Sequence, residues 1–129
     1  MEDFYRELII ERYKDPHFRG VLDPNDITYE DDNPSCGDHI QIDVRLDENG
    51  IVTEALFSGE GCAISLASAD LLLESIIGKS VDDIKELSKE DILENLGIEL
   101  GPVRLKCALL PLKVLKAGIY GINKTEKSD

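Results

Sequence analysis

The sequence predicts an α+β fold, with a three-stranded antiparallel sheet and helices packed on one face. Apolar residues alternate with polar ones over 40–46 and return in a second β-prone run over 51–57, as in half-buried strands. A short β-prone run at 27–29 precedes them, and stretches with helical spacing flank the three. Because a sheet with one apolar face needs helices on that face, these patterns predict a single domain over 1–129.

The first half of the chain predicts one helix and the three strands. A helix is expected at 3–14, where apolar residues recur at spacings of one, three and four. Asp15-Pro16 ends it, because proline disfavours helical geometry in the residue before it. A loop leads to the strand at 27–29, and turn-forming residues at 31–38 separate that strand from the next. Asn49-Gly50 suits a tight hairpin between the second and third strands.

The second half predicts helices only. One should begin near Cys62 and end at Gly78, and it is apolar nearly all round, which is typical of a buried helix. Ser80 and Ser88 each precede an acidic residue by three places, as N-caps of short helices do. The last helix is expected to start close to Pro111, with Cys107 just before it. The polar tail at 123–129 is expected to be frayed.

Composition and charge exclude several classes of function. The 129 residues carry a formal net charge of −13, from 27 acidic and 14 basic residues. This balance argues against binding to nucleic acid or to an anionic membrane, since both attract cationic surfaces. The start of the chain is acidic and no apolar run is long enough to span a bilayer. We therefore expect a cytoplasmic protein with reduced thiols.

The three cysteines, an odd number far apart in sequence, favour metal or thiol chemistry over a disulfide framework. Cys36 lies in a loop rich in turn formers, and Cys62 lies at a helix start, where the helix dipole favours a thiolate. Cys107 follows Arg104 and Lys106, cations that favour the thiolate when they face it. Any one of these cysteines alone is more often inert, so the prediction of a site depends on all three together.

Asp38 completes a candidate ligand set with the cysteines. It lies two residues after Cys36, so both side chains can reach one ion across a tight turn. Three thiolates and one carboxylate make four ligands, the number that zinc takes in tetrahedral sites. Asp38 taken alone is also explained as a turn-capping carboxylate. His39 is either a substitute ligand or a solvated group, and His17 is expected at the surface.

Three motifs that contain the cysteines carry a family resemblance: NPSCGD at 33–38, GEGCAISLAS at 59–68 and RLKCAL at 104–109. In this order they resemble the NifU/IscU/SufU family of iron–sulfur cluster assembly proteins, as does the N-terminal stretch 5–22. The resemblance implies an α+β fold with a three-stranded sheet. It also implies that Cys36, Asp38, Cys62 and Cys107 bind zinc or a transient [2Fe-2S] or [4Fe-4S] cluster.

The sequence combines features of two branches of this family. Lys106 before the third cysteine is similar to SufU-type members, since IscU-type members have histidine there, but the chain lacks the SufU insertion between the second and third cysteines. The stretch 100–104, LGPVR, departs at two positions from the Leu-Pro-Pro-Val-Lys motif by which IscU-type members engage a heat-shock chaperone. This departure argues against chaperone binding.

The resemblance implies a scaffold rather than an enzyme, one that accepts persulfide sulfur from a SufS/IscS-like cysteine desulfurase and supplies recipient apoproteins. Cys107 is the predicted acceptor, with Arg104 and Lys106 in support. Asp38 is a harder ligand than a thiolate, so it is expected to leave the metal first. Two alternatives stay open: a zinc-dependent sulfur relay that assembles no cluster, and a structural zinc-binding domain.

Overall fold

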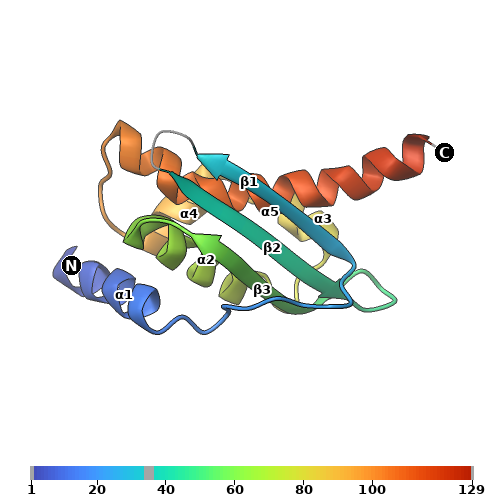
Figure 1. Ribbon diagram of the computed structural model, residues 1–129, viewed down its shortest axis with the longest axis horizontal. Helices are drawn as coiled ribbons and strands as arrows, with labels where there is room; N and C mark the ends of the chain where they lie inside the picture. Colours follow the sequence, from blue (N-terminus) through green and yellow to red (C-terminus); the bar gives the residue numbers. More distant parts are fainter. Residues whose placement is uncertain (1, 34–36, 129) are drawn as a thin grey trace.

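A three-stranded antiparallel sheet forms one layer of the molecule, and helices pack against one of its faces (Figure 1). The strands are β1 (Ile27–Asn33), β2 (Asp38–Leu46) and β3 (Val52–Glu60), with β2 in the middle. This computed structural model describes residues 2–33 and 37–128, and the side chains of residues 4–33 and 37–120. The predicted fold class is confirmed.

All three strands are longer than the sequence predicted, and β2 begins at Asp38, inside the predicted turn. Asp31 and Asp32 are turn formers by propensity, yet they pair with Ile40 and His39 of β2. β3 likewise continues to Glu60, beyond the predicted end at position 57. Strand preference depends on cross-strand neighbours as much as on local propensity, and pairing with β2 prevails here. As a result, β1 ends, β2 begins and β3 ends at the same edge of the sheet.

The inner face of the sheet is apolar, as the alternation predicted. Inward side chains of β2 and β3 are almost completely buried: Ile40, Ile42, Val44, Ala55 and Phe57. Helix α2 (Ala63–Ile76) is buried along most of its length and is followed by Gly78, whose φ of 85° suits glycine. Helix α5 (Pro102–Ser128) packs against both α2 and the sheet. These contacts make one continuous core, whose buried side chains are aliphatic apart from Phe57 and Cys107.

Two short helices, α3 (Val81–Lys85) and α4 (Lys89–Leu96), connect α2 to α5. Ser80 caps α3 as predicted, since its side chain accepts the backbone N–H of Asp83 at 3.1 Å and its own N–H donates to the Asp83 carboxylate. At α4, the backbone N–H of Ser88 donates to the Asp91 carboxylate at 2.8 Å. Both predicted helix starts are confirmed.

The start of the last helix was predicted wrongly. α5 begins at Pro102, so Pro111 lies inside the helix and Cys107 lies in its second turn. Proline has no N–H to donate to the carbonyl four residues earlier, which is that of Cys107. The next carbonyl, of Ala108, accepts a hydrogen bond from the Ser68 hydroxyl of α2 at 2.7 Å. The helix also extends through Ser128, in place of the frayed tail that was expected.

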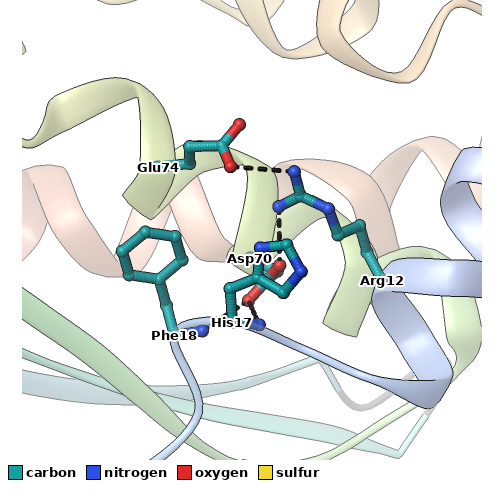
Figure 2. Close-up of polar contacts among 5 residues, drawn as sticks. All are labelled: Arg12, His17, Phe18, Asp70 and Glu74. Carbon is teal, nitrogen blue, oxygen red and sulfur yellow. Dashed lines mark hydrogen bonds and ion pairs between the residues drawn. The ribbon is translucent and has the colours of Figure 1, made fainter.

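A buried ion pair fixes the N-terminal helix α1 (Glu2–Lys14), which lies beside α2 (Figures 1 and 2). The Asp70 carboxylate of α2 accepts a hydrogen bond from the Arg12 guanidinium at 2.8 Å and from the backbone N–H groups of His17 and Phe18, each at 2.8 Å. A second guanidinium nitrogen of Arg12 donates to Glu74 at 2.8 Å. One aspartate thus holds both α1 and the chain that follows it.

Candidate metal centre

Three of the four predicted site residues converge at one end of the sheet. Asp38 begins β2, Cys62 precedes the first residue of α2, and Cys107 lies in α5. One ligand atom from each lies within 4.8 Å of the other two. Asp38 and Cys107 are each 1% exposed, whereas Cys62 is exposed to solvent. The fourth predicted residue, Cys36, lies outside the described residues.

The sheet and α2 place Asp38 against Cys62. Asp38 faces inward from β2, and β3 ends at Glu60, so the chain reaches Cys62 after a single further residue. One carboxylate oxygen of Asp38, Oδ1, accepts the backbone N–H of Cys62 at 2.9 Å. The carboxylate therefore bonds one of the free N–H groups at the start of α2, where the helix dipole favours negative charge.

The second carboxylate oxygen of Asp38 fits a bound cation. Oδ2 is buried and has no hydrogen-bond partner among the described residues. Burying a charged oxygen without a partner is costly, and a metal ion would satisfy it. Cys107 is disulfide-bonded in this structure. Once it is reduced, two sulfurs and one carboxylate oxygen are ligands that zinc and iron accept, and a fourth ligand would complete a tetrahedral site. The residues present therefore fit such a metal.

Gly61 leaves the room that this arrangement needs. A Cβ atom built at position 61 would lie 2.7 Å from Asp38 Oδ1 and would also collide with the Ser65 hydroxyl. The backbone passes so close to the carboxylate that only glycine fits. The sequence placed Gly61 in a motif but did not indicate this packing role.

The predicted supporting cations are at the surface. Arg104 and Lys106 are both exposed, and among the described side chains neither forms an ion pair with the site. Arg104 lines a groove of about 760 Å³, between α1, the start of α2 and residues 98–104, onto which Cys62 opens. Lys106 borders a smaller cavity beside Asn33. Cys107, which was expected just before the last helix, instead belongs to the core.

The two histidines lie away from the three converging residues. His39 follows Asp38 on β2, so its side chain points to the other face of the sheet, where Nδ1 lies 2.5 Å from the Asp32 carboxylate. His17 is exposed, as expected, and its backbone N–H binds Asp70.

Sequence reasoning missed one residue at this site. The side-chain amide of Asn33, at the end of β1, donates a hydrogen bond to Cys107 Sγ at 3.8 Å. The signal was present, because Asn33 opens the motif that contains Cys36 and Asp38. The sequence did not show that Asn33 lies beside the site, because this depends on the register of β1 with β2, which pairs Asn33 with Asp38.

The fold and the site together define a class: small α+β proteins in which cysteines and a carboxylate converge at one end of a three-stranded sheet. A family model described as NifU-like N terminal domain matches residues 4–129. The chain belongs to this family, which confirms the resemblance drawn from the motifs.

Two curated relatives and one solved structure illustrate the similarity. The zinc-dependent sulfurtransferase SufU of Bacillus subtilis is 36% identical, and the alignment covers 92% of this chain and 91% of that protein. The iron–sulfur cluster assembly scaffold protein IscU of Escherichia coli K12 is 34% identical, with 89% and 91% covered. The crystal structure of FiSufU from Fervidobacterium islandicum AW-1 superposes with a TM-score of 0.72 at 30% identity, covering 88% of this chain and 94% of that one.

Within the described part of the chain, no helix combines the length and hydropathy that a membrane span requires.

Proposed function

We propose that this protein is an iron–sulfur cluster assembly scaffold and sulfur acceptor that binds zinc or a nascent cluster. The observation that supports this proposal most is the convergence of Cys62 and Cys107 on the carboxylate of Asp38, whose Oδ2 is buried and has no hydrogen-bond partner among the described residues. Relatives named as scaffold and as sulfurtransferase, similar over most of their length, support the same function. We further propose that 1–129 acts as one domain, in the cytoplasm.

The proposed ligands are Asp38, Cys62 and Cys107, with Cys36 as the fourth. Asp38 is the ligand proposed to exchange, because a carboxylate is harder than a thiolate and holds zinc or ferrous iron less strongly than sulfur does. Its other oxygen is already bonded to the backbone of Cys62, so the carboxylate stays in place when a metal–oxygen bond breaks. The cluster is cargo in this scheme, and the protein's residues hold and release it.

Sulfur transfer needs a thiolate that can reach a donor persulfide. The acceptor sulfur attacks the terminal sulfur of the donor, a new S–S bond forms, and the donor cysteine leaves as a thiolate. The proposed donor is a SufS/IscS-like cysteine desulfurase, and the proposed recipients are apoproteins. Cys107 remains the acceptor that we propose, and Cys62 is the competing candidate because it is exposed on the groove.

Persulfide mapping tests this assignment. The protein is incubated anaerobically with a cysteine desulfurase and cysteine, and the added 32 Da of one sulfur atom is located by mass spectrometry. Persulfide on Cys107, lost in Cys107→Ser and kept in Cys62→Ser, is expected. Persulfide on Cys62 alone would reassign the acceptor, and its absence from every cysteine would refute the sulfur-acceptor proposal.

A zinc-dependent sulfur relay that builds no cluster is the second candidate, because the Bacillus subtilis relative is named a zinc-dependent sulfurtransferase. Anaerobic reconstitution with ferrous iron, desulfurase and cysteine separates the two. Visible sulfide-to-iron absorbance in the protein fraction would support the scaffold. Transfer of sulfur without that absorbance would support the relay.

A further inference from the structure

Asn33 contacts two residues of the candidate metal centre, Asp38 through strand pairing and Cys107 through its side chain. It ends β1 opposite Asp38, which begins β2. Its backbone carbonyl accepts the N–H of Gly37, the residue before β2, at 2.9 Å. Its side-chain nitrogen Nδ2 donates to Cys107 Sγ at 3.8 Å, and the residue is only 8% exposed. A single buried residue therefore links the end of β1, Gly37 and the sulfur of α5.

We propose that Asn33 is a positioning residue for the metal centre: its amide orients the Cys107 sulfur toward the ion and hydrogen-bonds that sulfur while it is a ligand. This inference rests on the proposed function, because it requires Asp38, Cys62 and Cys107 to share one ion. Groups that hydrogen-bond a ligand fix its orientation and tune the metal, and their loss typically lowers metal affinity about 10- to 100-fold.

The chemistry of the position supports an amide. Asn33 lies on the inner side of β1, in the same alternation as the buried Ile27, and the sulfur that it contacts belongs to the core. A buried amide is costly unless it is hydrogen-bonded, and its bond to sulfur offsets that cost. The donor is also neutral, so it orients the sulfur without competing with the metal for the negative ligands as a cation would.

The Ser65 hydroxyl, which contacts the sulfur of Cys62, does not share this role. Ser65 Oγ lies 3.8 Å from Cys62 Sγ, with the thiol as donor. The hydroxyl itself donates to the backbone carbonyl of Cys62 at 3.1 Å. Within the part of the chain that the structure describes, Asn33 is thus the side chain that donates to a sulfur of the site.

Zinc affinity of the full chain tests the proposal. Asn33→Leu keeps the size of the side chain and removes its donors, and Asn33→Asp keeps its shape and replaces the donor by a charged acceptor. The matched control is Asn25→Leu, which removes an amide that, among the described residues, bonds only the Leu22 carbonyl at 3.0 Å, away from the site. In competition with a chromophoric chelator, both Asn33 variants should bind zinc about 10- to 100-fold more weakly than wild type, and the control should not.

Cobalt(II) provides a readout that a purely structural role would not move. A hydrogen bond to a thiolate lowers the energy of its lone pairs, so its loss should shift the sulfur-to-cobalt charge-transfer band to longer wavelength. We expect this shift in Asn33→Leu and Asn33→Asp and an unshifted band in Asn25→Leu. Urea unfolding of the metal-free proteins accompanies the spectra and measures the stability that each substitution removes.

The outcomes separate this inference from the proposed function. Wild type that binds zinc, with Asn33 variants equal to it in affinity and in band position, overturns the role of Asn33 alone. Weaker binding with an unshifted band, in step with lower stability of the metal-free chain, also overturns it, because Asn33 would then be structural. Wild type that binds neither zinc nor cobalt overturns the metal site itself and this inference with it.

Discussion

Replacing Asp70 by alanine is expected to lower the free energy of unfolding by about 3–5 kcal/mol, the cost of breaking a buried ion pair from one side. The Asp70 side chain is fully buried, that of Arg12 is 10% exposed, and the two charged groups are 2.8 Å apart. The substitution leaves the guanidinium with Glu74 as its one partner among the described residues, and it removes the acceptor of two backbone N–H groups. Small domains have only about 5–15 kcal/mol of stability, so the loss is severe.

Glu74→Ala is the matched control, since Glu74 is the second carboxylate on the same guanidinium. Its side chain is 49% exposed, so solvent screens the pair and the expected cost is about 1 kcal/mol or less. Urea unfolding followed by circular dichroism gives both values, provided that the denaturant slopes agree. Equal costs for Asp70→Ala and Glu74→Ala would refute the reasoning. Hydrogen exchange should also rise in α1 and at residues 17 and 18, because both depend on Asp70.

Four further predictions concern the site and its surroundings. Asp38→Ala should hold iron longer than wild type against a chelator, because the exchangeable ligand is gone, and faster loss would contradict that role. Gly61→Ala should weaken zinc binding about tenfold or more in calorimetry by displacing the Asp38 carboxylate, whereas Gly101→Ala, whose Cβ meets no atom within 4 Å, should match wild type. Chelation of the metal should leave the helical circular dichroism intact, since the core is aliphatic, and unfolding would instead favour a structural zinc domain. The hydrogen bond to Asp32 raises the pKa of His39 above its ordinary 6.5, so Asp32→Asn should lower the midpoint in an NMR titration. The stability from this pair is fully present below pH 6.5 and is lost as the pH rises through the raised pKa, and an unmoved midpoint would show that the pair does not form in solution.

The sheet and the helix after Cys62 were predictable because their signals are local. Alternation over 40–46 predicts which side of β2 is buried, and Ile40, Ile42 and Val44 occupy that side. The lengths of the strands were less predictable. Asp31 and Asp32 enter β1 because β2 offers them partners, and single-residue propensities carry no such information.

The start of α5 could not be predicted from the sequence for a different reason. Two prolines, Pro102 and Pro111, each suit a first helical turn, and the sequence alone gives no preference between them. The structure begins the helix at Pro102, which turns Cys107 from an expected loop residue into a core residue. The convergence of three site residues followed from the motifs, but the burial of one sulfur and the contact with Asn33 required the tertiary structure.

The candidate ligands come from three separate elements, β2, the start of α2 and α5. An ion bound by all three joins segments that are distant in the chain, so binding and the packing of α5 on the sheet are thermodynamically linked. A partner that loosened α5 would therefore lower the affinity for the cargo without contacting the metal. The free energy of this coupling would equal that by which the bound cargo opposes binding of the partner. Under the proposed function, release of the cargo would therefore depend on how α5 packs, and a recipient that loosened α5 from its outer surface would promote that release.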